Sequence, residues 1–260
     1  MVDMSAEDFC AIAAVNDDGI LADCLARSPD IVSGRLPLKT VRGVSSMAHA
    51  YNQGLDMAPG KIAILVHQDV YLPAGWLDHA VAILNALTLD HPDWMVAGPY
   101  GVRDTGEHIG RVWDVNLRTE LGATGFPATP VGSLDELLLI LRREPEFRFD
   151  PALPHFHLYG TDLVQSARAM GRGAFAVELP VVHNNRPWDS LGGGYRLAYR
   201  YVRHKWRDRL PIHTTICPIS RNPLPLWRAQ WGRRHVTSRG EGVLADSVDV
   251  ARAADYERRS

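Results

Sequence analysis

A run of five consecutive apolar residues, Ile62 to Val66, constrains the fold of this chain more than any other feature of the sequence. Apolar and β-branched side chains throughout a run are typical of a central strand that is covered on both faces. Similar runs occur at Phe9 to Val15 and at Trp94 to Ala97, and the segments 45–58 and 76–89 between them carry apolar residues at helical spacing. Strands that alternate with helices of about 10–15 residues predict an α/β fold with a mostly parallel central sheet and right-handed crossovers.

The remaining segments have weaker patterns. Four further elements are predicted: a strand at 37–43, a helix capped by Thr161, a strand at 174–182 and a helix from about Tyr195 to Arg207. The stretch 98–133, which is rich in Gly, Thr and Pro, is either a loop-rich insertion or a β-hairpin around Trp113. The run 134–141 is either a strand or a buried helix, because its length fits both.

Composition excludes several classes of protein. The 260 residues are 46% hydrophobic and 22% charged, with a formal net charge of −2, which is typical of a globular chain and not of a disordered or fibrous one. The three cysteines are too far apart for a CxxC pair, so we expect neither a disulfide scaffold nor a structural zinc knuckle. No apolar run approaches the roughly 18 residues of a membrane span, and the acidic N-terminal residues differ from a secretory signal. We therefore expect a cytoplasmic protein.

Charge is distributed unevenly along the chain. Residues 196–239 contain eleven Lys and Arg and one acid, a net charge of +10, whereas the remainder has 17 basic and 29 acidic residues, a net charge of −12. We expect one domain over 1–210 and a basic, largely irregular extension over 211–260. The basic segment either packs against the acidic body, receives an anionic acceptor such as a lipid phosphate, contacts an anionic membrane or mediates a homodimer. We expect no nucleic-acid partner, because the acidic remainder would repel it.

Polar residues follow two of the predicted strands, at the edge where open α/β sheets bind ligands. Asn16 follows the first strand, and His67-Gln68-Asp69 follows the third. A carboxylate at this position can hold a hard divalent cation, which in turn neutralises a pyrophosphate. Capping of a turn is an equally good explanation of Asp69.

Two later residues are candidates for the same site. His183 ends an apolar strand and is either an ordinary hydrogen-bonded histidine or, with Asp69, a mixed oxygen and nitrogen donor pair suited to Mn²⁺ or Mg²⁺. Asp162 lies in the first turn of a predicted helix. There it either stabilises the helix dipole or acts as a general base that the dipole keeps ionised.

Several motifs occur in a characteristic order: Ala50-Tyr-Asn52-Gln-Gly54, Ile62 to Val70, Phe156-His157-Leu-Tyr159-Gly-Thr-Asp162, Pro180-Val-Val-His183 and the segment 199–211. The ordered set resembles the family-2-like glycosyltransferases, in particular the group related to a streptomycin-biosynthesis protein. The resemblance covers about residues 8–215. It implies a GT-A fold, one α/β domain with a nucleotide-binding half and an acceptor-binding half. It also implies an inverting, metal-dependent transfer of a sugar from a nucleotide-diphosphate donor.

The resemblance implies roles for individual residues. Asp69 matches the last position of the DxD-type motif that binds metal and diphosphate, His183 matches the histidine that completes this site, and Asp162 matches the catalytic base of inverting members. The other implied positions are Asn16, Asn52 and Gln68 for the donor, and Asp135, His157 and Trp188 for the acceptor. The glycine-rich loop next to Trp188 is either a lid over the donor or a plain exposed linker.

The sequence departs from the family pattern in two places. His67 stands where many relatives have the first acid of the DxD motif, which predicts a weaker or different metal. Asp135-Glu136 replaces the usual Asp-Gly, which predicts an altered acceptor pocket.

Of three candidate functions, two fit these residues. We expect a glycosyltransferase that uses a divalent cation, Mn²⁺ or Mg²⁺, and a carbohydrate or lipid-linked acceptor. The alternative is a non-catalytic member of the same fold that binds a nucleotide or a glycan, which His67 supports. A nucleotidyltransferase would need a basic, Gly-rich triphosphate loop after the first strand, and residues 16–19 contain no base.

Overall fold

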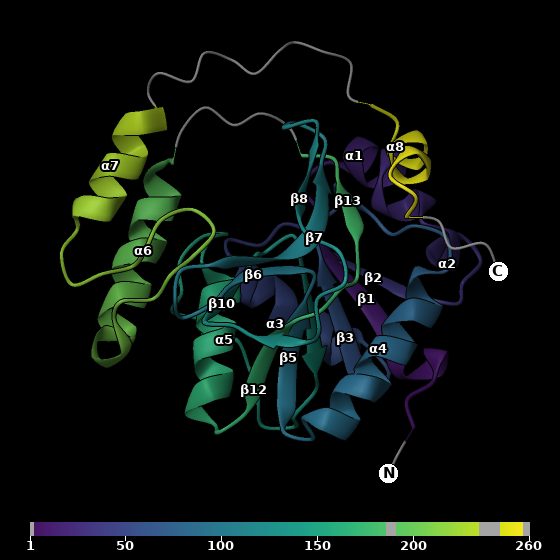
Figure 1. Ribbon diagram of the computed structural model, residues 1–260, viewed down its shortest axis with the longest axis horizontal. Coiled ribbons are helices and arrows are strands. Elements are labelled where there is room, and N and C mark those ends of the chain that lie inside the picture. Colours follow the sequence, from purple (N-terminus) through teal and green to yellow (C-terminus); the bar gives the residue numbers. More distant parts are fainter. Residues whose placement is uncertain (1–2, 186–190, 234–244, 257–260) are drawn as a thin grey trace.

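A seven-stranded sheet forms the centre of the computed structural model, which describes residues 3–185, 191–233 and 245–256 (Figure 1). Its strands lie in the order β2-β1-β3-β11-β5-β12-β9. Their bounds are β1 Phe9–Ala14, β2 Leu38–Val41, β3 Ile62–Val66, β5 Trp94–Gly98, β9 Thr129–Pro130, β11 Leu138–Arg142 and β12 Gly173–Ala176. All five residues of β3 are buried, as its apolar run predicts. The α/β fold class is thereby confirmed, and so are the four predicted strands that correspond to β1, β2, β3 and β5.

Most strands of the central sheet run in one direction, as the sequence pattern predicted, but two are reversed, so the sheet is mixed. β1 pairs in parallel with β2 and β3, and β12 pairs in parallel with β5. β11 lies antiparallel between β3 and β5, and β9 lies antiparallel to β12. The run 134–141 thus supplies a reversed strand in the middle of the sheet. An apolar pattern reports burial and carries no information on strand direction, so this reversal could not be predicted from it.

A second sheet of short strands packs beside the first. Its order is β10-β6-β7-β13-β4, with β8 paired to β7. The bounds are β4 Val70–Tyr71, β6 Tyr100–Val102, β7 His108–Asp114, β8 Thr119–Gly122, β10 Ser133–Leu134 and β13 Val181–His183. Trp113 of β7 opposes Glu120 of β8, so 98–133 contains the hairpin that was one of its two predicted forms.

The predicted single strand at 174–182 is in fact two strands in different sheets. β12 belongs to the central sheet and β13 to the second one. The chain leaves the first ladder after β12 ends at Ala176, and Pro180, which has no N–H to donate, immediately precedes β13 in the second sheet. This division matters for the site, because it carries His183 away from the central sheet.

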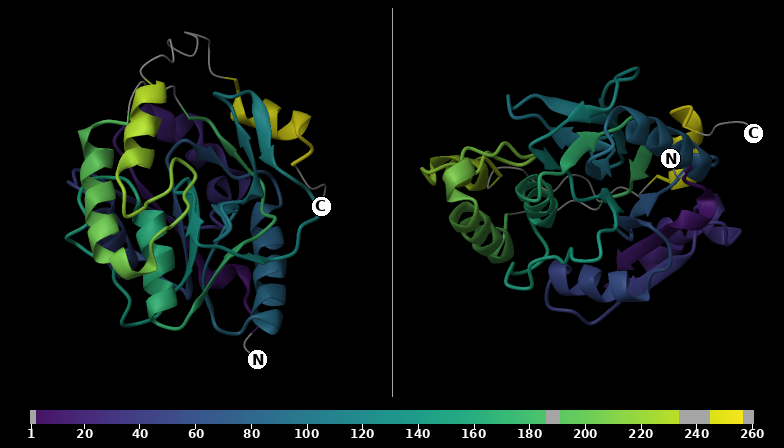
Figure 2. Two further views of the ribbon diagram at one scale, coloured as in Figure 1. Left: turned by 60° about the vertical axis from the view of Figure 1, so that its left-hand side comes forward. Right: turned by 90° about the horizontal axis from the view of Figure 1, so that it is seen from below.

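Helices cover both faces of the central sheet (Figures 1 and 2). The longer helices are α3 Met47–Met57, α4 Trp76–Asp90, α5 Tyr159–Ala169 and α6 Gly193–Lys205. One buried cluster includes residues of α3, α5 and α6, and a second cluster includes residues of α4. The helices predicted at 45–58 and 76–89 are confirmed. Helix α5 begins two residues before the predicted cap Thr161, because the N–H of Asp162 already donates to the carbonyl of Leu158 at 2.9 Å.

Shorter helices complete the chain. They are η1 Ala6–Asp8, α1 Asp18–Asp23, η2 Leu25–Arg27, α2 Pro29–Val32, η3 Arg207–Arg209, α7 Leu224–Arg233 and α8 Ser247–Ala253. Within 211–260, the segment predicted to be an irregular extension, α7 lies beside α6 and α8 contacts β13. None of the described helices combines the length and apolarity that crossing a bilayer requires.

Candidate functional site

Three side chains meet where β3 of the central sheet and β13 of the second sheet end. His67 and Asp69 follow β3, and His183 is the last residue of β13. His67 Nδ1 lies 3.9 Å from Asp69 Oδ1, and His183 Nε2 lies 3.6 Å from Asp69 Oδ2. One potential ligand atom of each residue lies within 4.8 Å of the others. The structure therefore brings Asp69 and His183 together and adds His67 to them.

Asp69 carries an unsatisfied oxygen. Its Oδ1 is buried and has no hydrogen-bond partner within the described part of the chain. Leaving a charged acceptor unpaired is costly, so this oxygen indicates a missing positive ligand. Burial opposes ionisation of the carboxyl, but the adjacent His183 and His67 outweigh burial and hold the pKa of Asp69 below its usual range. Asp69 is therefore a carboxylate that faces two imidazole rings.

A hydrogen-bond chain orients the ring of His67. The hydroxyl of Tyr159 donates to the carbonyl oxygen of Glu136 at 2.8 Å and lies 2.6 Å from His67 Nε2. Because the hydroxyl has a single proton, the network assigns the proton between the two side chains to Nε2 of His67. The lone pair of Nδ1 then points toward Asp69. Burial lowers the pKa of His67 and keeps the ring neutral, which is the form that binds metals.

The donor set of this cluster fits a divalent cation. Carboxylates suit Mg²⁺ and Mn²⁺, while imidazole nitrogens suit later transition metals, so two histidines and one aspartate favour Mn²⁺ over Mg²⁺. The same two-histidine, one-carboxylate set also holds Fe²⁺ in some enzymes. Burial lowers the pKa of His183, but Asp69 outweighs burial and raises it, so a proton competes with a cation for this ring. The unpaired oxygen of Asp69 and the free lone pair of His67 are the two features that a cation would satisfy.

Gln68 ties this cluster to the loop after β1. Its Oε1 accepts hydrogen bonds from the backbone N–H groups of Asn16 and Asp17, at 3.0 and 3.2 Å. Its Nε2 donates to Oδ1 of Asn16 at 2.5 Å. Because β1 and β3 are parallel neighbours, both loops leave the same edge of the sheet. The structure thus brings three of the predicted donor-site residues, Asn16, Gln68 and Asp69, to one place.

Other predicted residues are placed differently. The side-chain amide of Asn52 donates to the carbonyl of Phe149 at 2.9 Å and accepts from the N–H of Phe149 at 2.8 Å. Both of its polar atoms are therefore used to fix the backbone at Phe149. His157 is half-buried, and burial lowers its pKa; the next largest influence on that pKa is His67, which places His157 near the cluster. Trp188 lies outside the described residues, but the glycines of the predicted loop do not: Gly192 is the N-cap of α6, and Gly193 and Gly194 belong to its first turn.

Two acidic residues before β11 lie beside the cluster. The pKa of His183 is lowered by burial and raised by Asp69. The carboxylate of Asp135 raises it further, with a smaller effect. Glu136 Oε1 accepts from the N–H of Gly160 at 3.1 Å, and burial raises the pKa of Glu136 to about 8. The sequence singled out Asp135 for the acceptor and noted Glu136 only as a departure from the family pattern.

Asp162 is enclosed by the end of α6. Lys205 Nζ lies 2.9 Å from both carboxylate oxygens, and Trp206 Nε1 donates to Oδ1 at 2.7 Å. The residue is 2% exposed, and Lys205 also pairs with Asp150 at 2.8 Å. These contacts bind the start of α5 to the end of α6. The catalytic role of Asp162 remains a prediction, and its contacts favour a structural role.

Tyr159 is the functional candidate that the sequence analysis did not single out. It lies at the start of α5, is fully buried, and its hydroxyl orients His67. The sequence offers it only as an unremarkable member of the motif around Asp162. Tyr159 contacts a histidine that is 92 positions away in the chain, so no pattern in the sequence around Tyr159 predicts this contact.

Comparison with known proteins gives partial likenesses. No protein-family model matches this chain. A Fuscovulum blasticum protein described as "ATP synthase subunits region ORF 6" is 31% identical over 145 residues, which are 52% of this chain and 56% of that protein. This chain therefore spans little more than half the length of that relative.

Among solved structures, two glycosyltransferases have a similar arrangement of sheets and helices. The mannosyltransferase PcManGT from Pyrobaculum calidifontis, solved with GDP-Man and Mn²⁺, is 15% identical with a TM-score of 0.46, covering 95% of this chain and 73% of that one. Glucosyl-3-phosphoglycerate synthase from Mycobacterium tuberculosis, solved with Mn²⁺, UDP and phosphoglyceric acid, is also 15% identical, with a TM-score of 0.43. It covers 76% of this chain and 78% of that one. These identities and TM-scores are too low to assign a function.

Proposed function

We propose that this chain transfers a sugar from a nucleoside-diphosphate donor to an acceptor hydroxyl, using a divalent cation. The observation that supports this most is the buried, unpaired oxygen of Asp69 facing the lone pair of His67, at the ligand-binding edge of an α/β sheet. The ordered motifs of the sequence point to the same activity. Placement in the group related to a streptomycin-biosynthesis protein depends on those motifs alone.

Each side chain of the cluster has a proposed task. His67, Asp69 and His183 would hold the cation, and a cation there would offset the charge that builds on the departing diphosphate. Tyr159 holds the ring of His67 in the tautomer that leaves Nδ1 unprotonated. Gln68 fixes the loop at Asn16 against the cluster, where that loop can contact the nucleotide base.

The transfer itself moves one glycosyl group and one proton. The oxygen of the acceptor hydroxyl forms a bond to the anomeric carbon while the bond from that carbon to the diphosphate oxygen breaks, which inverts the configuration. The hydroxyl proton goes to a carboxylate, and the electron pair leaves with the nucleoside diphosphate. The family resemblance implies Asp162 as the residue that takes the proton. Because Asp162 is bound to Lys205 and Trp206, we propose Asp135, whose carboxylate raises the pKa of His183, as the alternative proton acceptor.

A thermal-shift experiment tests the donor and metal site. Chelator-treated protein is mixed with Mn²⁺, Mg²⁺ or Fe²⁺, alone and with UDP-, GDP- or dTDP-sugars. A ligand at about 100 times its Kd stabilises the folded state by about 2.7 kcal/mol, which is a rise in Tm of several degrees for a chain of this size. We expect the largest rise with Mn²⁺ and one nucleotide sugar together.

Asp69→Asn is the matched test variant and Asp56→Asn its control. Asn keeps the size of the side chain but removes the charge and one oxygen from the cluster, so the rise in Tm with Mn²⁺ should be lost. Asp56 pairs with Arg148 on an exposed surface, and its variant should keep the full rise. If Asp69→Asn responds to Mn²⁺ and nucleotide sugar like the unchanged protein, the proposed site is wrong.

A second function, binding of a nucleotide or glycan without transfer, is favoured by the enclosure of Asp162. A non-catalytic protein would show the same rise in Tm but neither transfer nor slow hydrolysis of the bound sugar. Product analysis with the stabilising nucleotide sugar separates the two functions. Release of nucleoside diphosphate that Asp69→Asn abolishes supports transfer chemistry.

A further inference from the structure

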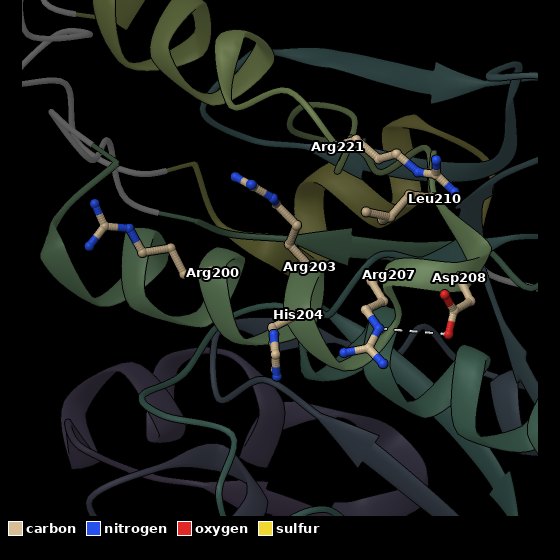
Figure 3. A pocket seen from close by; sticks show the side chains of 7 residues that line it. All are labelled: Arg200, Arg203, His204, Arg207, Asp208, Leu210 and Arg221. Atoms are coloured by element: carbon tan, nitrogen blue, oxygen red, sulfur yellow. Dashed lines mark ion pairs between the residues drawn. The ribbon is translucent and has the colours of Figure 1, made fainter.

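Helix α6 lies on the flank of the molecule opposite α4 (Figures 1 and 2), and an open groove is lined by residues of α6 and of the segment that follows it. This groove has a volume of about 510 Å³ and is lined mainly by basic side chains: Arg200, Arg203, His204, Arg207 and Arg221, with Asp208 and Leu210. Figure 3 shows Arg200 and Arg203 on successive turns of α6, Arg207 just beyond its end, and Arg221 across the groove. Four arginines and a histidine against one acid make the lining of this groove strongly basic.

Within the described residues, the arginines that line the groove make almost no ion pairs. In the described part of the chain, Arg200, Arg203 and Arg221 have no carboxylate within ion-pair distance, and Arg207 has only its neighbour Asp208, at 3.8 Å. Elsewhere arginines pair closely, as Arg168 does with Asp104 at 2.9 Å. Clustered cations without counter-charges repel one another. Their arrangement therefore indicates an anionic partner outside the chain.

Helix α7 adds an apolar surface next to the arginines. A second hollow, lined by Arg196, Arg203, Leu224 and Trp227, joins α6 to α7. Leu224, Trp227 and Trp231 recur at steps of three and four, so they share one face of α7. Trp227 is 58% and Trp231 54% exposed, and their rings stack with centroids 6.1 Å apart. Leu226, on a different face, is buried and anchors the helix.

We propose that the flank formed by α6 and α7 docks on the surface of a bilayer that contains anionic lipids. Arginines attract anionic headgroups, and tryptophans and leucines on one helix face enter the interfacial layer. The negative remainder of the chain, with a net charge of −12 outside 196–239, favours one orientation, with this flank toward the lipid. The docking depends on neither the metal cluster nor the transferase activity.

Charge also decides against a second copy of this chain as the occupant. A symmetric dimer through this flank would set the arginines of one copy against those of the other. Single-stranded RNA offers phosphates and stacking bases, but the aliphatic side chain of Leu224 has no role in that interaction. A lipid surface uses the arginines, the tryptophans and the leucine together.

Vesicle co-sedimentation of the full chain tests the docking. The vesicles contain phosphatidylcholine alone or with about 30 mol % phosphatidylserine, a content that gives a negative surface potential. We expect binding only to the anionic vesicles and its loss as salt rises from about 0.1 to 0.5 M. Arg200→Gln with Arg203→Gln should lower the partition coefficient about 30-fold, from about fivefold for each arginine near the surface.

Controls separate docking from general charge and folding effects. Arg103→Gln with Arg148→Gln removes two exposed arginines from elsewhere and should leave the partition coefficient within about twofold. Trp227→Ser should weaken binding, whereas Leu89→Ser, at an exposed apolar position of α4, should not. Circular dichroism melts confirm that the variants are folded.

Three outcomes would overturn the proposal. One is equal binding to neutral and anionic vesicles, and another is equal loss of binding in both arginine double variants. The third is binding to a poly(U) oligonucleotide in place of vesicles, which would identify the flank as an RNA surface.

Discussion

Replacing Asp162 by asparagine separates a structural role of this residue from a catalytic one. The carboxylate is buried and receives hydrogen bonds from Lys205 and Trp206, at 2.9 and 2.7 Å. Asparagine keeps the shape and can still accept from Trp206. Its NH₂ group, however, then faces the ammonium of Lys205. Both groups are hydrogen-bond donors, so the charged hydrogen bond from Lys205 to Oδ2 is lost.

The cost follows from burial and from what Lys205 retains. Removing one partner of a buried ion pair costs about 3–5 kcal/mol. Lys205 keeps Asp150 at 2.8 Å, and burial already raises the pKa of Asp162, so we take a lower value of about 2–3 kcal/mol. At about 2–4 °C for each kcal/mol, Tm should fall by roughly 4–12 °C.

The assay is a thermal melt of Asp162→Asn beside Asp104→Asn. Asp104 pairs with Arg168, which lies on α5 as Asp162 does. The side chain of Asp104 is 71% exposed, so Asp104→Asn should change Tm by at most about 3 °C. If instead Asp162→Asn melts with the unchanged protein and loses sugar transfer while it still binds the donor, our structural reading is refuted. Asp162 would then be the base that the sequence predicts.

Two further predictions concern pH and packing. The folded state raises the pKa of Glu136 from 4.5 to about 8, so it keeps a proton that the unfolded chain loses; this contribution to stability is full below about pH 4.5 and disappears as pH rises to about 8. In metal-free protein, the Tm of Glu136→Gln minus that of the unchanged protein should therefore increase from pH 5 to pH 8, and a constant difference would contradict the assignment. Gly54→Ala would press its Cβ into Cγ2 of Ile12, where α3 packs on β1, and should cost about 1–3 kcal/mol in urea unfolding. Gly193→Ala, whose Cβ meets nothing within 4 Å, should cost less than about 0.5 kcal/mol in the same titration.

Local pattern predicted most of the elements that frame the site. The apolar runs marked β1 and β3, and the rule that ligands bind beyond the ends of such strands placed Asn16 and Asp69 at one edge. The direction of β11 was beyond prediction, because the long excursion through the second sheet decides which way the chain returns. The break at Pro180 was visible in the sequence, but an apolar run on both sides of it concealed the change of sheet.

Long-range contacts account for what the sequence could not show about individual side chains. A helix-start aspartate is equally consistent with a free base and with a buried anchor, and the decision lies with Lys205, which is 43 positions away and arrives with α6. The amide of Asn52 could likewise face a donor, yet the loop at Phe149 claims both of its polar atoms. Residue type and spacing limit the chemistry of a side chain, and tertiary packing selects its partner.

His67 shows how the same packing changes the meaning of a substitution. As a replacement for an acid in a metal-binding motif, it predicts a weaker site, because one carboxylate is lost. In the structure burial lowers the pKa of the ring, Tyr159 lies 2.6 Å from its Nε2, and its Nδ1 lies 3.9 Å from the carboxylate of Asp69. In the proposed metal site, the substitution would therefore change the type of ligand without removing one, and would shift the preference from Mg²⁺ toward Mn²⁺ or another transition metal. The histidine at position 67 and the Tyr159 hydroxyl depend on each other. The hydroxyl donates its only proton to Glu136 and can accept one from His67, whereas a carboxylate at position 67 would have no proton to donate.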